Sequence, residues 1–134
     1  MTEENKRENI KVEMERSVRA LREADVLFEN ELVSGAVSRL YYSLLYGMRA
    51  LLLARGFEPK SHEGALRLFG LHFVKEGIFG ISDSHVFSRL MKYREEADYN
   101  AAYSFSNDDF VGFRKEALAL TGKIEVYLKE KGYL

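Results

Sequence analysis

The chain has 134 residues, of which 46% are hydrophobic and 31% charged, with one proline and no cysteine. This length and composition predict a single globular domain over residues 1–134, and the lack of cysteine excludes disulfides, thiolate metal sites and a thiol nucleophile. The formal net charge of −1 argues against a uniformly basic nucleic-acid binder.

Neither a secretory signal nor a membrane span is apparent in the sequence. Residues 1–30 alternate charges and contain no apolar core of the kind that a signal peptide needs. The most apolar stretch, Leu40–Ala54, contains Arg49 and is shorter than the roughly 20 residues that cross a bilayer. We therefore expect a cytoplasmic protein without a membrane partner, and we interpret this stretch as a buried central helix.

The N-terminal half contains two predicted helices. Residues Thr2–Glu29 place apolar side chains at mostly three-, four- and seven-residue intervals among charges, which indicates an amphipathic helix. Residues Leu32–Arg55 are apolar on nearly every side and include a stripe of small residues, which predicts a helix surrounded by neighbours. Gly56 and Pro59 then end this helix and open a loop. The small-residue stripe consists of Ala36, Ser43, Gly47, Ala50 and Ala54.

Three further helices are predicted in the second half. The first runs from the possible N-cap Ser61 to Lys75, and the next begins near Ser82-Asp83 and ends at about Tyr99. Ser106 and Asp109 form a capping-box pattern that opens the last helix, which ends before Gly132. With no credible strand, the fold class is all-α, an up-and-down antiparallel bundle of four or five helices. Eight tyrosines and nine phenylalanines exceed what one small core needs, which favours a homodimer.

Charge is distributed unevenly along the chain. Between Leu32 and Lys75, six cationic residues stand against two acidic ones, so this segment has a net charge of +4 and the rest of the chain −5. Two explanations fit this pattern. The segment forms an anion-binding face, or its cations pair with acids of neighbouring helices.

Three pieces of the sequence, in this order and spacing, resemble the HEPN superfamily of nucleotide-binding helical domains, and especially its small stand-alone archaeal and bacterial members. They are the Tyr-Tyr helix Arg39–Ala54, the Pro-Lys-Ser-His-Glu-Gly turn Pro59–Gly64, and Arg94-x3-Asp98-Tyr99. The resemblance extends over roughly residues 10–131. It implies a helical bundle that is usually a homodimer and is often encoded beside a small nucleotidyltransferase in toxin–antitoxin pairs.

Many members of this superfamily are metal-independent RNases with an Arg-x(4–6)-His motif on the helix before last. The resemblance implies that the arginine stabilises phosphate charge and that the histidine handles protons. In this chain Arg94 is followed at the corresponding place by Tyr99, and the histidine is missing. Because a tyrosine hydroxyl ordinarily ionises at about pH 10, Tyr99 is a poor substitute as a base. The modified tyrosine that stands two residues beyond the histidine in active members corresponds here to Ala101.

These observations leave three hypotheses. The first is a protein that binds nucleotide or RNA phosphate and acts as the helical partner of a nucleotidyltransferase. The second is an endoribonuclease toxin in which Tyr99 or His62 replaces the missing histidine, with Arg94 and Tyr99 as catalytic candidates. The third is a structural dimerisation module. We predict no cofactor and no metal, because the histidines have no short ligand spacing. The candidate phosphate-binding residues are Arg94, Asp98, Tyr99, Lys60, Ser61, His62, Arg39 and Tyr42.

Two other places fit the Arg-x(4–6)-His spacing literally. Arg55 precedes His62, and Arg67 precedes His72. With this many arginines in the chain, such matches are expected by chance. We interpret His72 as a partly buried helix residue, and His62 as an anion-binding residue at a helix N-terminus or as a tie between loop and bundle.

Overall fold

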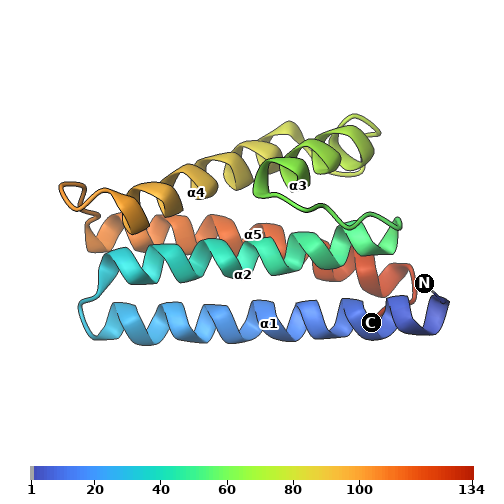
Figure 1. Cartoon of the computed structure of the whole chain (residues 1–134), viewed down its shortest axis with the longest axis horizontal. Coiled ribbons are helices and arrows are strands. Elements are labelled where there is room, and N and C mark those ends of the chain that lie inside the picture. The colour runs from blue at the N-terminus through green and yellow to red at the C-terminus, as the bar shows by residue number, and fades with distance from the viewer. Residues whose placement is uncertain (1) are drawn as a thin grey trace.

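The computed structural model of the chain describes residues 2–134, and the regular elements in that range are all helices (Figure 1). The long helices lie side by side and alternate in direction along the chain. The predicted all-α class and helical bundle are therefore confirmed. The elements are α1 (Glu3–Glu29), α2 (Val33–Ala54), α3 (His62–Phe69), the π-helical turn η1 (Gly70–Val74), α4 (Ile81–Tyr99) and α5 (Asn107–Glu130).

Helix α2 is the centre of the bundle and packs against α1, α4 and α5. Burial on several sides explains why this helix is apolar nearly all round, as the sequence predicted. Its largest fully buried side chains include Leu40, Tyr41, Leu44 and Met48. Among the helices of residues 2–134, none is long and apolar enough to cross a membrane.

The small residues of α2 let its neighbours approach closely. The Ser17 hydroxyl of α1 donates to the Ser43 backbone oxygen at 2.7 Å, and the Ser43 hydroxyl donates to the Ser17 backbone oxygen at 2.8 Å. At Gly47, an added Cβ would lie 3.5 Å from Cγ2 of Thr121 on α5. These residues face the neighbouring helices, which supports the interpretation of the stripe.

Several predicted helix ends are confirmed. Gly56 adopts a left-handed conformation with a φ of 83° directly after α2. The Ser61 hydroxyl accepts a hydrogen bond from the Gly64 N–H at 2.9 Å and caps α3. Ser106 and Asp109 form the expected capping box at the start of α5.

Two helix boundaries differ from the prediction. The third helix was predicted to reach Lys75, but its α-helical part ends at Phe69 and continues as the π-turn Gly70–Val74. Helix α4 was predicted to begin near Ser82-Asp83, but its N-cap is Gly80, whose N–H donates to the Asp83 carboxylate at 2.9 Å. Asp83 is thus the third residue of the first turn, and it caps the helix from inside.

Candidate functional site

A histidine and a tyrosine from different helices meet beside the centre of the bundle. His62 is the first residue of α3, and Tyr41 lies on α2 with its side chain fully buried. The Tyr41 hydroxyl is 2.6 Å from His62 Nδ1, and the two rings stack with centroids 5.5 Å apart. The capped N-terminus of α3 therefore holds His62 directly against α2.

Arg94 of α4 reaches the same place. It is only 8% exposed, and its guanidinium carbon lies 5.6 Å from the Tyr41 ring centre and 6.0 Å from that of Tyr42. A third tyrosine ring, Tyr99 at the end of α4, is 5.9 Å away. The nearest carboxylate is Asp98 at 3.7 Å, and the buried Nε has no hydrogen-bond partner among the described residues. We call Tyr41, Tyr42, His62, Arg94, Asp98 and Tyr99 the Arg94 cluster.

Burial and charge fix the protonation of this cluster. Burial raises the pKa of Tyr41 well above its ordinary value, so its hydroxyl keeps its proton. The pKa of His62 is lowered, first by burial and then by the positive charges of Arg94 and Arg49. Near neutral pH the cluster therefore contains a protonated tyrosine, a neutral imidazole and a guanidinium ion.

The hydrogen bond between Tyr41 and His62 also selects a tautomer. Within residues 2–134 the Tyr41 hydroxyl has no other hydrogen-bond partner, and a buried hydroxyl proton without an acceptor is costly. Both groups are satisfied when Tyr41 donates to Nδ1, and the imidazole proton is then on Nε2. We infer that His62 offers an N–H donor, not a lone pair, at its second ring nitrogen.

Comparison with known proteins identifies the family. The family profile described as "HEPN domain" matches residues 10–128. The chain belongs to the HEPN family. It is 38% identical over 93 residues to the Methanocaldococcus jannaschii protein named "Putative toxin MJ0605", an overlap of 69% of each chain. It is also 31% identical over 115 residues to a Thermotoga maritima protein named "UPF0332 protein", covering 86% of this chain and 87% of the relative.

The structure brings most of the predicted site residues of this HEPN chain together. Arg94, Asp98, Tyr99, His62 and Tyr42 all belong to the Arg94 cluster. The other three predicted residues lie around it. Ser61 caps α3 and Lys60 is exposed beside it, while Arg39 stacks on the Tyr42 ring at 5.2 Å and pairs with Glu23 at 3.0 Å.

Two residues of the site were not among the predicted candidates. Tyr41 supplies the only hydrogen bond to the His62 ring within residues 2–134. Arg49 acts on both Tyr41 and His62 through its charge, and it has no ion-pair partner in the described part of the chain. The signal for Arg49 was present in the sequence, since it is the one charge inside the most apolar stretch.

His72 lies apart from the cluster. His72 stacks on Phe57 with ring centroids 4.3 Å apart, and its backbone oxygen accepts from Arg55 at 3.5 Å. His72 is therefore a partly buried helix residue, as interpreted from the sequence. No group of three or more histidine and carboxylate residues within residues 2–134 is arranged to hold a metal ion.

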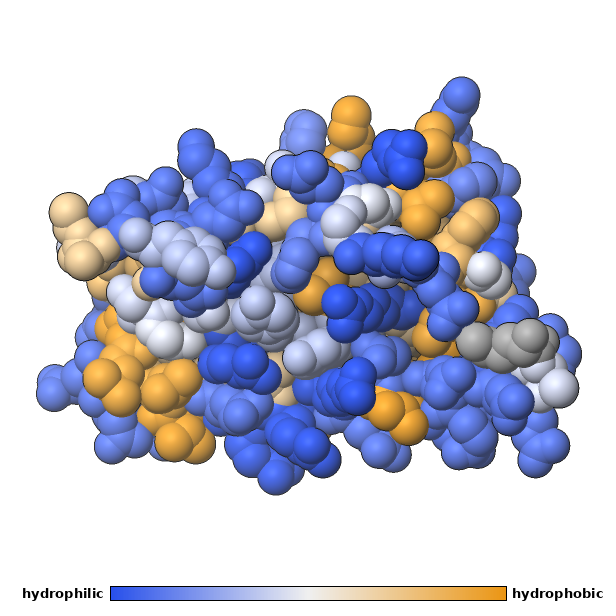
Figure 2. Space-filling view, in the orientation of Figure 1, coloured by the Kyte–Doolittle hydropathy of each residue, from blue (hydrophilic) through white to orange (hydrophobic). Residues whose placement is uncertain are grey.

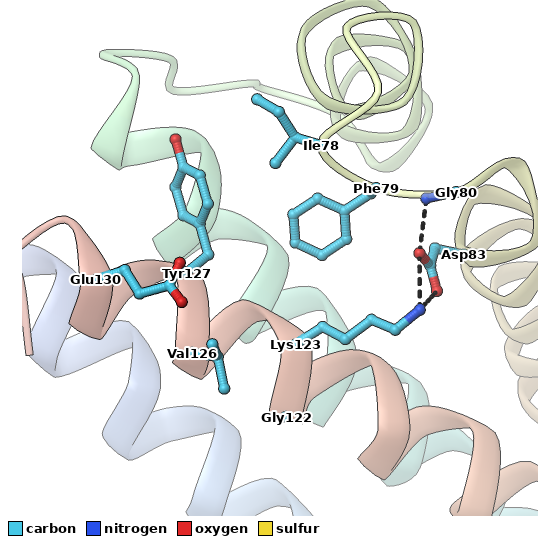
Figure 3. Close-up of a pocket in the computed structure, with 9 residues that line it drawn as sticks. All are labelled: Ile78, Phe79, Gly80, Asp83, Gly122, Lys123, Val126, Tyr127 and Glu130. Atoms are coloured by element: carbon cyan, nitrogen blue, oxygen red, sulfur yellow. Dashed lines mark hydrogen bonds and ion pairs between the residues drawn. The ribbon is translucent and has the colours of Figure 1, made fainter.

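A larger hollow within residues 2–134 lies away from the Arg94 cluster. It lies between the start of α4 and the last turns of α5, and its wall contains Phe79, Val126 and Tyr127 (Figure 3). The Asp83 carboxylate sits at its edge, between the Gly80 N–H and the Lys123 ammonium at 3.0 Å. These polar groups satisfy one another and cap α4, so we assign this hollow a structural role.

The lowered pKa of His62 predicts a dependence of stability on pH. The unfolded chain has a histidine pKa near 6.5 and binds more protons than the folded chain below that pH. The stability that the neutral ring contributes is therefore present above about pH 6.5 and lost as the pH falls toward the folded-state value. We expect an NMR titration of the His62 ring to give a pKa below 6.5, and Arg94→Met to raise it. A pKa at or above 6.5 in the unmodified protein would contradict the placement of His62 beside two guanidinium groups.

Proposed function

We propose that this HEPN chain binds the phosphate of a nucleotide or of RNA, with Arg94 as the charged binding residue. The observation that supports this most strongly is that the Arg94 guanidinium is buried but not fully hydrogen-bonded within the described residues. The guanidinium is held in place by three tyrosine rings, but its one ion pair is long, 3.7 Å to Asp98, and its Nε is unpartnered. A buried guanidinium with free donors matches the oxygens of a phosphate, which accept charge-assisted hydrogen bonds.

The neighbours of Arg94 suit the same ligand. The neutral His62 ring offers its Nε2–H as a donor, and Lys60 and Ser61 stand at the N-terminus of α3 beside it. Arg39 and Tyr42 extend the cationic and aromatic surface along α2. This set binds anions through hydrogen-bond donors and requires no metal.

A titration with small phosphate probes tests this proposal. Labelled ATP and the dinucleotide pUpU are titrated at low salt into the unmodified protein and into Arg94→Met, which removes the charge but keeps an apolar side chain of similar length. Loss of a bidentate, charge-assisted contact is expected to weaken binding at least about tenfold. The matched control is Arg89→Met, because Arg89 lies on the same helix, is exposed and pairs with Glu116. Equal affinities of both variants for both probes would overturn the proposal.

We further propose that the chain works in the cytoplasm as a homodimer and as the helical partner of a small nucleotidyltransferase in a toxin–antitoxin pair. The support is the family membership together with the names of relatives, two of which are called putative toxins. Co-expression with the product of an adjacent nucleotidyltransferase gene, followed by gel filtration and light scattering, tests both assemblies. A monomer that does not co-elute with the nucleotidyltransferase would contradict them.

A second candidate function is a metal-independent endoribonuclease. The observation that favours it is His62, which enters the Arg94 cluster from α3 and so places an imidazole beside the arginine despite Tyr99 in the motif. The inferred tautomer makes His62 a donor, which favours binding over general-base catalysis. RNA cleavage in EDTA that disappears in both Arg94→Met and His62→Gln would establish the nuclease. If neither binding nor cleavage depends on Arg94, the remaining hypothesis is a structural dimerisation module.

A further inference from the structure

Four residues on one face of α2 form a row in which two aromatic rings lie between two cations. Arg39, Tyr42, Tyr46 and Arg49 are spaced by three, four and three residues, so they lie on the same side of the helix. The Tyr42 and Tyr46 ring centroids are 6.2 Å apart. Arg39 lies 5.2 Å from the Tyr42 ring, and Arg49 lies 5.9 Å from the Tyr46 ring. We call these four residues the α2 strip.

The neighbouring helices add one arginine each at the sides of the strip. Arg94 of α4 lies 6.0 Å from the Tyr42 ring, and Arg16 of α1 lies 6.0 Å from the Tyr46 ring. Helices α1 and α4 lie on either side of α2 in Figure 1, and the space-filling view in Figure 2 shows mostly polar side chains over the middle of this face. The largest hydrophobic groups of that face gather toward its ends.

Some buried polar atoms near the strip have no hydrogen-bond partner among the described residues. The buried side-chain atoms without a hydrogen-bond partner in residues 2–134 are Glu13 Oε2, Arg39 Nε and Arg94 Nε, and Glu13 pairs through its other oxygen with Arg16. Buried polar groups are normally satisfied, and the two Nε atoms are donors that an anion could satisfy, whereas Glu13 Oε2 is an acceptor and does not serve such a ligand.

The charge balance of this face favours an anion. Three of the arginines form ion pairs with acidic side chains. Glu23 pairs with Arg39, Glu13 pairs with Arg16, and Asp98 lies 3.7 Å from Arg94. Arg49 forms no ion pair within residues 2–134, although Glu13 and Glu58 line the same hollow. Guanidinium groups beside adjacent tyrosine rings are the combination that binds single strands, because phosphates contact the cations while unpaired bases stack on the rings.

We propose that the α2 strip is a binding track for single-stranded RNA, which continues from the phosphate held at Arg94 toward Arg49. This inference rests on the proposed phosphate-binding function and extends it to a ligand several nucleotides long. The eleven-residue stretch from Arg39 to Arg49 spans about 15 Å, the length of roughly four stacked nucleotides. A duplex does not fit this chemistry, because its bases stack on one another and are not free to cover tyrosine rings.

Fluorescence anisotropy with a short and a long probe tests the track. The probes are labelled pUpU, which reaches only the Arg94 cluster, and a labelled oligouridylate about twelve nucleotides long, within the range of sizes that single-strand sites cover. Tyr46→Ala is expected to lower the affinity for the long probe about tenfold and to leave pUpU binding unchanged. Tyr46→Phe keeps the ring and is expected to bind both probes normally.

Salt dependence gives an independent readout. Because each phosphate contact contributes about −0.7 to the slope of log K against log salt for a single strand, Arg49→Gln is expected to make the long-probe slope less negative by about that amount. The matched control is Lys115→Gln, which removes an exposed charge on α5, away from the strip. It is expected to leave the slope unchanged.

The outcomes separate the two proposals. If Arg94→Met weakens pUpU binding but Tyr46→Ala and Arg49→Gln leave the long probe unaffected, the track is wrong and the phosphate site stands. If Arg94→Met does not weaken pUpU binding, or if the unmodified protein binds neither probe, the phosphate site itself fails and the track fails with it. A hairpin of the same length that binds as tightly as the single strand would also overturn the track. Conversion of a dimer into monomers by Tyr46→Ala, without loss of RNA affinity, would show that the strip contacts a second copy instead.

Discussion

Replacing Tyr41 with alanine is expected to lower the free energy of unfolding by about 3–5 kcal/mol, the range for removing a large aromatic side chain from a core. Tyr41 has no exposed surface and stacks on Phe87 with ring centroids 6.0 Å apart. Its ring also supports the Arg94 guanidinium and the His62 ring. The truncation would leave a cavity where α2, α3 and α4 meet. Urea unfolding, monitored by circular dichroism, measures the loss in the free energy of unfolding.

Two further variants make this prediction specific. Tyr41→Phe keeps the packing and loses only the hydroxyl bonded to His62, so it is expected to cost about 1 kcal/mol. Tyr103→Ala removes a tyrosine that is 43% exposed and is expected to cost less than Tyr41→Ala by at least about 2 kcal/mol. If Tyr41→Ala and Tyr103→Ala are equally stable, Tyr41 does not hold the cluster together as the structure indicates.

The helices were predictable because each depends on local signals. Helix α2 is apolar on nearly all sides, and Ser61 and Ser106 stand directly before their helices, so pattern and caps agree. The start of α4 was misplaced because Ser82-Asp83 has the composition of an N-cap, whereas Gly80 takes that position and Asp83 reaches back to its N–H. The π-turn at Gly70–Val74 has no composition signal of its own, because one widened turn leaves the apolar pattern nearly unchanged.

The site was predicted unevenly for a different reason. Arg94 and Tyr99 were found through the resemblance to the HEPN family, and His62 was found because it follows a capping serine. Tyr41 and Arg49 were not selected, because a residue on an apolar helix looks like core until the position of α3 is known. The hydrogen bond from Tyr41 to His62 joins residues 21 positions apart, and no periodicity within one helix reports such a contact.

The structure changes the meaning of the missing motif histidine. The helix that bears Arg94 has no histidine at the expected place, but α3 brings His62 to the same tyrosine ring that Arg94 contacts. Arginine and imidazole are thus neighbours in space without being neighbours in sequence. Because Tyr41 fixes the imidazole as a donor, and burial together with two guanidinium groups lowers its pKa and keeps it neutral, this pairing suits the binding of an anion better than the abstraction of a proton.

Arg94→Glu is expected to destabilise the fold by about 3–5 kcal/mol at neutral pH, because it places an unpaired carboxylate where the native side chain is only 10% exposed. The change also removes the contacts of a cation with three tyrosine rings and sets a negative charge one turn from Asp98 and beside Glu95. Burial and these like charges would raise the pKa of the introduced carboxyl above its unfolded value. The penalty is therefore present above that raised pKa and is relieved as the pH falls below it.

Urea unfolding of Arg94→Glu and Arg94→Met at pH values near 7.5 and 5 separates the charge from the packing. Arg94→Met is expected to remain close to the unmodified protein at both pH values, because an apolar side chain of similar volume often replaces a buried ion without loss. Arg94→Glu is expected to be the least stable near pH 7.5 and to recover part of the difference from Arg94→Met near pH 5. Arg89→Glu, on the 50%-exposed side chain of the same helix, controls for the charge change alone and is expected to cost no more than about 1 kcal/mol. Equal losses for Arg94→Glu and Arg89→Glu would mean that Arg94 is solvated, and the buried phosphate-binding guanidinium would have to be abandoned.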